Sequence, residues 1–312
     1  MARELLHSVA PSVASLAEQL LSIRPREEAV TLDGIRANTP NLRALMGSYR
    51  GQVTERDIVI ALRDGEALSG RLFTPAGADA DTLVVYAHGG GWVYGDTEFV
   101  ADVAAYMALS TQARVLSISY RLAPEHHSPA AEVDVVAQLR AIAAEPGRVA
   151  PSARRIVVVG DSAGGYLALR AMLQLSSQER RTVEGLVLIY PAVNPPNDAT
   201  RPTTPDGITL TANRVEMFWN LYQPNPSARA SATDAEGTRS SLASLPPTSV
   251  VTVELDPLRE EGQELAAQLS EIGVLKDVVN LRGQLHGLLW MRGLTDEADQ
   301  IFDVIRTHIH DQ

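Results

Sequence analysis

Ser162 is the residue whose surroundings most clearly predict chemistry, because it stands at the centre of the segment GDSAGG, residues 160–165. An apolar run from Ile156 to Val159 precedes this segment and a helical pattern follows it, so we expect a buried strand to turn sharply into a helix. Glycines two residues before and after the serine would let neighbouring backbone pass without Cβ clashes. The hydroxyl would then be exposed, and the first N–H groups of the helix would point toward a developing oxyanion. The segment predicts a serine nucleophile.

Two other interpretations of the segment are weaker. The turn could carry Ser162 only as a helix cap. A dinucleotide-binding fingerprint fits less well, because the serine occupies the place of the second glycine in G-x-G-x-x-G. A serine hydroxyl is a poor nucleophile until an imidazole takes its proton and a carboxylate orients that imidazole, so the interpretation depends on finding both downstream.

Asp256 and His286 fit those two roles by position. Asp256 directly follows the apolar run TSVVTVE, and Pro257 biases it toward an extended or turn conformation outside the next helix. His286 follows the run DVVNL, in a loop that begins at Arg282. The order serine, acid, histidine is the one expected when the acid and the histidine follow the late strands of such a sheet.

Other carboxylates and histidines are less apt. The alternative acids lie in a predicted strand or helix, and they are Glu254, Glu260 and Glu261. Three histidines lie in terminal segments, where exposure is the simpler explanation, and these are His7, His308 and His310. His126 and His127 are adjacent and so point apart.

A glycine-rich loop provides a candidate for the oxyanion-binding site. The run TLVVYAH ends in HGGGW, residues 88–92, and three successive glycines permit a folded loop that directs N–H groups inward. The alternative is a flexible turn, but its pairing with a G-x-S-x-G turn is more specific than either motif alone. The Ala163 N–H would supply the remaining donor.

The elements that would hold these residues alternate along the chain. Two runs on either side of an Asp-Gly turn, residues 57–62 and 68–75, predict a hairpin. Six further apolar runs then alternate with helical patterns, which predicts an α/β protein with a mostly parallel, eight-stranded sheet covered by helices on both faces. The predicted helices span residues 42–48, 97–110, 130–144, from 162, 211–222, 258–272 and 296–308.

Composition excludes several classes of protein. Of the 312 residues 45% are hydrophobic and 21% charged, as in a globular protein with a large core. The net charge of −11 argues against a nucleic acid or an anionic membrane as partner. The chain has no cysteine, which excludes a thiol nucleophile and thiolate metal sites and fits a cytoplasmic location. We expect no signal peptide, no membrane-inserted segment and no cofactor. We also expect no metal, since no H-E-x-x-H spacing occurs.

Five motifs in this order resemble the bacterial hormone-sensitive-lipase-like carboxylesterases of the α/β-hydrolase superfamily. They are HGGGWVYGD (88–96), SYRLAPEHHSPA (119–130), GDSAGGYLA (160–168), DPLREEG (256–262) and the late His286-Gly287. The resemblance runs from about residue 57 to the C-terminus. It implies a Ser162, Asp256 and His286 triad, and it implies that the oxyanion donors are Gly89, Gly90 and Ala163. It also implies that the oxyanion loop is braced by His88, Asp96, Tyr120 and Glu125.

The resemblance also implies a helical cap over a catalytic core. We expect residues 1–50 to form the first cap segment and 51–190 the α/β-hydrolase core. Residues 191–225, which begin with a proline-rich stretch, would form a second cap segment, and 226–312 would complete the core. Family habit further suggests a homodimer, paired through the last strand or the terminal helix.

Two departures from the family pattern concern the pocket. Tyr166 stands where the family usually has asparagine, and residues 231–241 lack an expected proline-containing motif. Neither affects a triad position. Candidate walls of the substrate pocket are aromatic, namely Trp92, Tyr94, Phe218 and Trp219, although aromatic residues often belong simply to the core.

The resulting hypothesis is a serine carboxylesterase that cleaves short-chain acyl esters, small molecules, through an acyl-enzyme. The same triad would also serve a lactone or activated-amide hydrolase, and the sequence does not separate these reactions. A non-catalytic ligand receptor of the same fold is disfavoured because His286 is present in its full context.

Overall fold

One sheet forms the centre of the fold. The computed structural model describes residues 31–62, 67–196, 209–234 and 241–310, together with the single positions 14 and 18. The strands are β1 (Val53–Ala61), β2 (Ala67–Pro75), β3 (Asp79–Ala87), β4 (Ala113–Ile118), β5 (Arg155–Asp161), β6 (Val183–Ile189), β7 (Thr248–Leu255) and β8 (Leu275–Leu285). Their order across the sheet is β1-β2-β4-β3-β5-β6-β7-β8.

The pairing directions confirm the predicted mostly parallel sheet. β1 and β2 pair antiparallel up to Ala61 opposite Ala67, which confirms the hairpin, while the Asp-Gly turn itself lies outside the described residues. β2 also pairs antiparallel with β4, and every later pair, from β3 with β4 to β7 with β8, is parallel. Parallel neighbours place the carboxyl ends of β3, β5, β6, β7 and β8 at one edge of the sheet, where ligands bind in such folds.

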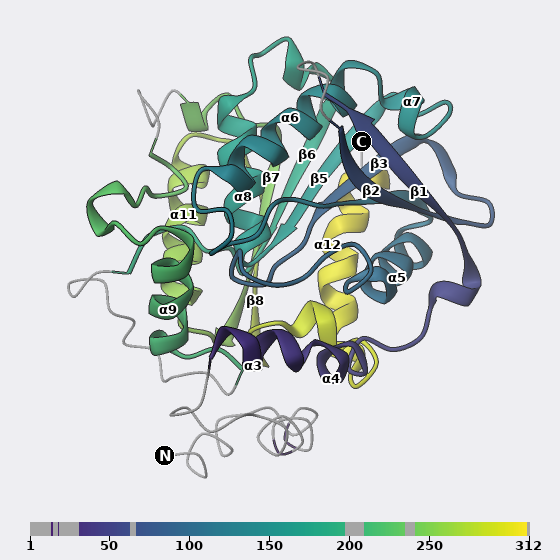
Figure 1. The fold of residues 1–312 in the computed structure, drawn as a ribbon. Helices are drawn as coiled ribbons and strands as arrows, with labels where there is room; N and C mark the ends of the chain where they lie inside the picture. Colours follow the sequence, from purple (N-terminus) through teal and green to yellow (C-terminus); the bar gives the residue numbers. More distant parts are fainter. Residues whose placement is uncertain are drawn as a thin grey trace.

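Helices cover both faces of the sheet (Figure 1). The α-helices are α3 (Leu32–Ala37), α4 (Thr39–Arg43), α5 (Ala101–Thr111), α6 (Ala130–Ala144), α7 (Pro146–Val149), α8 (Ala163–Gln174), α9 (Ala212–Tyr222), α11 (Arg259–Glu271) and α12 (Asp299–His310). Short 3-10 turns are η2 (Arg50–Gln52), η3 (Glu179–Thr182), η4 (Pro226–Ala228), η5 (Leu288–Met291) and η6 (Asp296–Ala298).

Alternating strand residues divide the core into two clusters. On β5, Ile156 and Val158 pack with residues of α6, α8 and α11, whereas Val157 and Val159 pack with residues of α5 and α12. Successive strand side chains point to opposite faces, so a nearly continuous apolar strand supplies both layers. The sheet therefore lies between two helix layers, with one core cluster on each face.

Helix boundaries are less accurate than helix positions in the predictions. The helix predicted at 42–48 is wrong in its limits, because α4 ends at Arg43 and Met46 already lies in a turn. The helix predicted from residue 97 begins at Ala101, since Asp96 Oδ1 accepts the Phe99 N–H in a preceding turn. The helix predicted from residue 296 begins as η6 and continues as α12.

The described parts of the segments assigned to the cap border one pocket. In Figure 1, α3 lies at the lower edge of the fold and α9 at its left side, and both line this pocket. The helix predicted within residues 1–30 lies outside the described residues apart from positions 14 and 18, as do residues 197–208 of the proline-rich stretch. The division into two cap segments and a core stays a prediction.

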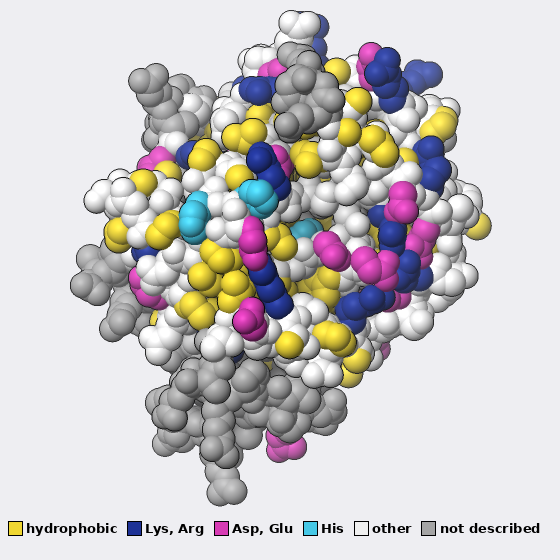
Figure 2. Space-filling view, in the orientation of Figure 1, with side chains coloured by type: hydrophobic (Ala, Val, Ile, Leu, Met, Phe, Trp, Pro, Cys, Tyr) yellow, Lys and Arg dark blue, Asp and Glu magenta, His cyan; other side chains and the backbone are white. Residues whose placement is uncertain are grey.

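The visible surface carries charges of both signs. Figure 2 shows basic and acidic side chains interleaved on this face. One network joins Arg50 to Glu55 at 2.7 Å and to Glu98 at 2.6 Å, and Arg71 also pairs with Glu98. Among the described residues, no helix is long and apolar enough to cross a membrane.

Candidate active site

Ser162 stands at the tight connection between β5 and α8. Its backbone φ of 54° and ψ of −119° lie in a region that non-glycine residues rarely adopt, which is the strained turn expected from the sequence. A Cβ added to Gly164 would overlap the carbonyl oxygen of Ala87, and one added to Gly160 would overlap the carbonyl oxygen of Gly164. Both glycines are therefore required by close backbone passage.

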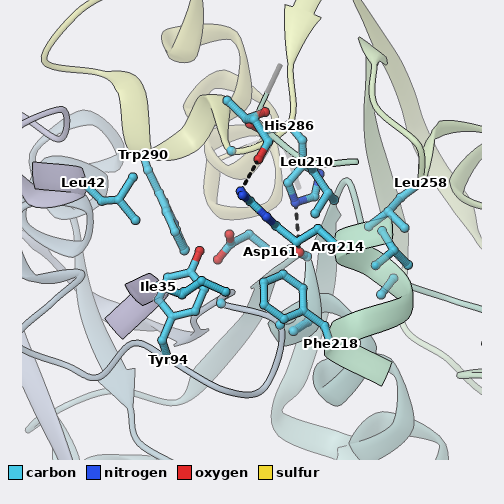
Figure 3. Close-up of a pocket in the computed structure, with 18 of the residues that line it drawn as sticks. Ile35, Leu42, Tyr94, Asp161, Leu210, Arg214, Phe218, Leu258, His286 and Trp290 are labelled. Carbon is cyan, nitrogen blue, oxygen red and sulfur yellow. Dashed lines mark hydrogen bonds between the residues drawn. The ribbon is translucent and has the colours of Figure 1, made fainter. Parts of the chain in front are cut away.

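The structure brings the three residues predicted to act together into hydrogen-bonding distance. His286, which Figure 3 shows in the pocket, has its Nε2 3.0 Å from Ser162 Oγ. Its Nδ1 lies 2.7 Å from Asp256 Oδ2. A carboxylate at Nδ1 keeps the proton on that nitrogen, which leaves Nε2 free to accept the serine proton. The arrangement can activate a hydroxyl for attack on a carbonyl carbon.

Neighbouring groups hold the acid and the imidazole in place. Asp256 is fully buried, and its second oxygen, Oδ1, accepts the Leu258 N–H at 2.9 Å. The Tyr190 ring packs against the imidazole of His286 with centroids 4.7 Å apart. Thr209 Oγ1 donates to the His286 carbonyl oxygen at 2.7 Å. Side chain and backbone of the histidine are thus both fixed.

Two of the three alternative acids, Glu254 and Glu261, are engaged elsewhere. Glu254 Oε2 accepts the Gly283 N–H at 2.7 Å. Glu261 is directed to the segment after β6, where its oxygens accept the N–H groups of Val193 at 2.8 Å and Asn194 at 3.3 Å. Burial raises the pKa of Glu261 to about 8, although those two N–H groups lower it. Neither carboxylate contacts the His286 ring.

The glycine loop contradicts one part of the oxyanion prediction. The Gly89 N–H donates to Asp161 Oδ1 at 2.8 Å, so the prediction that Gly89 donates to an oxyanion is wrong. Gly90 and Gly91, in contrast, both line the pocket beside Ser162, and both have positive φ, +118° and +59°. Ala163 also lines the pocket. Because it is the first residue of α8, no carbonyl within the helix accepts its N–H.

Asp161 and His88 hold the glycine loop in place through hydrogen bonds. Asp161 Oδ1 accepts the Tyr86 hydroxyl at 2.7 Å in addition to the Gly89 N–H, and burial raises the pKa of Asp161 to about 6. His88 Nδ1 lies 2.6 Å from the Gly89 carbonyl oxygen, and burial lowers the pKa of His88 to about 4, so the ring is neutral near pH 7. Tyr120 stacks on the His88 ring and donates to the His88 carbonyl at 2.7 Å.

Glu125 reaches the loop through an arginine of α3. Arg36 forms a bidentate pair with Glu125, at 2.6 and 2.8 Å. The same guanidinium donates to the Val93 carbonyl at 3.0 Å and to the Ala123 carbonyl at 3.0 Å. This side chain therefore ties the N-terminal segment to the loop that follows the glycines, a link that the sequence did not predict.

A cavity of about 150 Å³ opens directly above the serine. All four aromatic residues proposed as walls, Trp92, Tyr94, Phe218 and Trp219, line it. Apart from Ser162, His286, Asp161 and the loop residues already named, the lining residues are mostly apolar and come from three regions of the chain: Ile35, Asn38, Leu42, Leu45, Ala192, Thr209, Leu210, Arg214, Val215, Leu258, Gly287, Trp290 and Met291. The N-terminal helices, α9 and the core thus enclose one pocket.

Several pocket residues were not found from the sequence. Arg214 lies one helical turn before Phe218 on α9, so the spacing from a predicted wall residue could have indicated it. Gly91 could have been found as the third glycine of the loop, and Trp290 as an aromatic residue one turn after His286. Ile35 and Leu42 carry no sequence signal that connects them to Ser162.

Tyr166 packs within an aromatic group beneath the pocket. Its ring meets Trp92 edge-on at 5.3 Å and Trp219 at 5.5 Å, and its hydroxyl donates to the Ala230 carbonyl at 3.1 Å. The larger ring in place of the family's asparagine therefore supports two walls of the pocket. Residues 235–240 of the second departure lie outside the described residues.

Comparison with known proteins connects this geometry to a family. Residues 84–290 match the family described as the alpha/beta hydrolase fold. The chain belongs to this family. Two relatives of this α/β hydrolase are an ethyl acetate hydrolase of Pseudomonas putida, 28% identical over 81% of this chain and 82% of its own, and the carboxylesterase NlhH of Mycobacterium tuberculosis, 34% identical over 68% of each chain.

A solved structure shows that the similarity extends over nearly the whole length of this α/β hydrolase. The hyperthermophilic esterase from the archaeon Pyrobaculum calidifontis superposes with a TM-score of 0.82 at 29% identity, and the match covers 97% of this chain and 98% of that one. Together with the relatives, this structure confirms the resemblance to the hormone-sensitive-lipase-like carboxylesterases. No group of three or more side chains suited to a metal ion occurs within the described part of this hydrolase.

Proposed function

We propose that the protein is a serine carboxylesterase that hydrolyses small carboxylic esters through an acyl-enzyme. Its family membership makes the chain a carboxylic ester hydrolase. The observation that carries the finer proposal is the hydrogen-bonded chain from Ser162 through His286 to the buried Asp256, at 3.0 and 2.7 Å. That chain supplies a nucleophile, a general base and a group that orients the base.

In the proposed acylation, Ser162 Oγ attacks the ester carbonyl while His286 Nε2 takes its proton. The N–H groups of Gly90, Gly91 and Ala163 would then hold the oxyanion, since all three residues line the pocket at the serine. His286 gives the proton to the departing alcohol, and Asp256 stabilises the imidazolium in between. Water repeats the attack on the acyl-enzyme and releases the acid.

Short acyl groups fit the space above the serine best. The cavity of about 150 Å³ compares with an engineered protein cavity of about 150 Å³ that accommodates one benzene molecule. Its mostly apolar lining favours an apolar acyl or alkyl group of that size, because burying such a group in a preformed apolar site is favourable.

Rapid mixing with p-nitrophenyl acetate tests the acyl-enzyme. We expect a burst of p-nitrophenol equal to the enzyme concentration, followed by slower turnover, if deacylation limits the rate, and a covalent acetyl adduct in quenched samples. Ser162→Ala should show neither the adduct nor turnover above about one part in 10⁴ of the wild-type rate. Full turnover by that variant would contradict the proposal.

A further inference from the structure

Tyr94 presents a phenol hydroxyl to the pocket. Its side chain lines the cavity above Ser162, and Figure 3 shows the hydroxyl end directed into that cavity. Within the part of the chain that the structure describes, no group makes a hydrogen bond with this hydroxyl. A tyrosine hydroxyl enclosed by protein usually finds a partner, and it can both donate and accept. The hydroxyl of Tyr94 is therefore available to a bound ligand.

Other polar groups of the lining already have partners within the protein. Thr209 Oγ1 donates to the His286 carbonyl oxygen at 2.7 Å, and Ser162 Oγ lies 3.0 Å from His286 Nε2. Asp161 Oδ1 accepts one tyrosine hydroxyl and one backbone N–H, both from outside the pocket lining. Tyr94 differs from these groups, because its hydroxyl has no such engagement.

The backbone and the neighbouring rings hold Tyr94 in a defined position. Its N–H donates to the Gly90 carbonyl oxygen at 3.2 Å, so Tyr94 belongs to the turn that carries the proposed oxyanion donors. A Cβ at Gly90 would lie 2.0 Å from the Tyr94 carbonyl oxygen, which shows how closely the two residues pack. The ring lies among three others, with centroids 5.9 Å away for Phe99, 6.3 Å for Phe218 and 6.1 Å for Trp290. The hydroxyl is thus fixed beside the oxyanion loop.

The surroundings of the Tyr94 hydroxyl make it sensitive to the chemistry of the substrate. Burial raises the pKa of Tyr94 to about 12, so the hydroxyl keeps its proton at neutral pH and can donate it to a hydrogen bond. A wholly apolar substrate would displace water from this donor and leave it unpaired, which costs free energy. A substrate with an oxygen at that place avoids the cost. Sites with a buried polar group discriminate in this way against analogues that lack the matching atom.

We propose that Tyr94 selects esters that carry a second oxygen, of an ether or a ketone, which accepts a hydrogen bond from the Tyr94 hydroxyl while the scissile carbonyl lies at Ser162. This inference rests on the proposed function and names its substrate class. Tyr94 takes no part in bond making, so the acyl group moves to Ser162 Oγ and then to water as it does with any other ester. Tyr94 is therefore a specificity-determining residue.

Three pairs of esters test the inference and locate the second oxygen. On the acyl side, p-nitrophenyl methoxyacetate is compared with the butyrate, and p-nitrophenyl 4-oxopentanoate with the 4-methylpentanoate. On the alcohol side, 2-methoxyethyl acetate is compared with butyl acetate. Within each pair an oxygen replaces a carbon group of similar size. For wild type and Tyr94→Phe, which lacks only the hydroxyl, kcat and KM are measured for each ester, and thermal unfolding confirms that the variant is folded.

We expect Tyr94→Phe to lower the ratio of kcat/KM for the oxygen-bearing ester over its hydrocarbon partner about five- to tenfold in at least one pair, chiefly through KM. The intrinsic reactivity of each ester cancels, because the same ester is used with both proteins. The value of kcat/KM for the hydrocarbon partner should stay the same or rise, since no donor is left unpaired in the variant. The matched control is Tyr106→Phe, whose lost hydroxyl donates to Asp299 Oδ1 at 2.7 Å outside the pocket lining, and it should leave all three ratios unchanged.

The outcomes separate the inference from the proposed function. A fall confined to an acyl-side pair places the second oxygen in the acid, and one confined to the alcohol-side pair places it in the alcohol; either result supports the inference. Unchanged ratios in all three pairs, with the esters still cleaved, would overturn the inference and leave the esterase proposal standing. An equal loss of kcat on both members of every pair would also overturn it, because the hydroxyl would then act at the scissile carbonyl that all the esters share. Absence of turnover on every ester by folded wild-type protein would overturn the proposed function itself.

Discussion

At the scale of single residues, Asp256 is expected to act by fixing the tautomer of His286. In Asp256→Asn the amide oxygen can still accept the Leu258 N–H that Oδ1 accepts at 2.9 Å. The amide nitrogen would then face His286 Nδ1, 2.7 Å away, and donate to it, which leaves the proton on Nε2 toward Ser162. We predict a fall in kcat of about 10⁴-fold with p-nitrophenyl acetate and little change in thermal unfolding.

Glu254 offers a matched control for that substitution. Its carboxylate lies two positions earlier and accepts the Gly283 N–H at 2.7 Å, away from the imidazole. Glu254→Gln retains an acceptor oxygen, so kcat should stay within about tenfold of the wild-type value. Equal losses of kcat in both variants would mean that Asp256 has no special relation to His286.

Glu261 should make stability depend on pH. Burial raises its pKa to about 8, whereas an unfolded glutamate titrates near 4.3. The folded state therefore binds this proton more tightly, so the contribution to stability is greatest below about pH 4.3 and falls as pH rises to about 8. Urea unfolding between pH 5 and 8 should show a decline of a few kcal/mol that is smaller in Glu261→Gln.

Comparing the wild type with Glu261→Gln isolates the titration of Glu261, because both proteins contain all the other titrating residues. Protonated Glu261 and a glutamine are both neutral, so their difference should be small at pH 5 and should grow toward pH 8. A constant difference in the free energy of unfolding across that range would show that Glu261 does not titrate there.

The triad residues could be predicted from the sequence because chain order and the ends of apolar runs restrict them. Ser162, Asp256 and His286 each follow a predicted strand, and parallel strands bring their carboxyl ends to one edge. The role of Gly89 could not be predicted in the same way. Whether its N–H faces the pocket or the Asp161 carboxylate depends on the fold of the loop, which three glycines leave open.

At the scale of elements, the turn from β5 into α8 depends on glycine. A Cβ at Gly164 would overlap the carbonyl oxygens of Ala87 and His88, which are backbone atoms and cannot move aside without shifting β3. Gly164→Ala should therefore lower both thermal stability, by about 2 kcal/mol or more, and esterase activity. Circular dichroism melting and turnover of p-nitrophenyl acetate would measure these two effects.

Gly51→Ala is the control for that prediction. A Cβ at Gly51 meets no atom within 4 Å, and its φ is not positive. We expect its melting temperature and turnover to match those of the wild type closely. If Gly164→Ala were equally neutral, the close passage of β3 behind the serine would not constrain the turn.

The positions of strands could be predicted, but their ends, like helix ends, could not: β1 begins at Val53 and β8 continues to Leu285, beyond the predicted runs 57–62 and 277–281. The strands of this sheet are nearly continuous apolar runs, such as residues 156–159, because helices bury both faces, and that pattern is visible in the sequence. Helix ends depend on local caps and tertiary contacts. The start of α5, for example, follows a turn that Asp96 stabilises, and the enclosure of the pocket by α3 depends on Arg36 contacts that are distant in sequence.

At the scale of the whole molecule, the enclosed pocket should limit the acyl chain. The N-terminal helices, α9 and the core together bound about 150 Å³ above Ser162. We predict that kcat/KM is highest for p-nitrophenyl acetate or butyrate, falls for octanoate and is lost for palmitate, because a long chain finds no buried apolar surface. A maximum at palmitate would contradict the assignment of this cavity as the acyl site.

The binding partners, the cellular location and the oligomeric state of the protein were inferred from its charge, its cysteine content and the family resemblance. The expectation that nucleic acid is not a partner rests on the net charge of −11 and stays a prediction. Location in the cytoplasm and a homodimer stay predictions, since neither is a property that one copy of the chain displays.

The central claim is that Ser162 is the nucleophile, and labelling with an activated p-nitrophenyl alkylphosphonate tests it most directly. Intact-mass measurement of the full chain should show one phosphonyl group per molecule, with loss of esterase activity in the same proportion, and peptide mapping should place the group on Ser162. Folded Ser162→Ala should acquire no label. A stoichiometric adduct on another residue, or an active enzyme that acquires no label at all, would contradict the account.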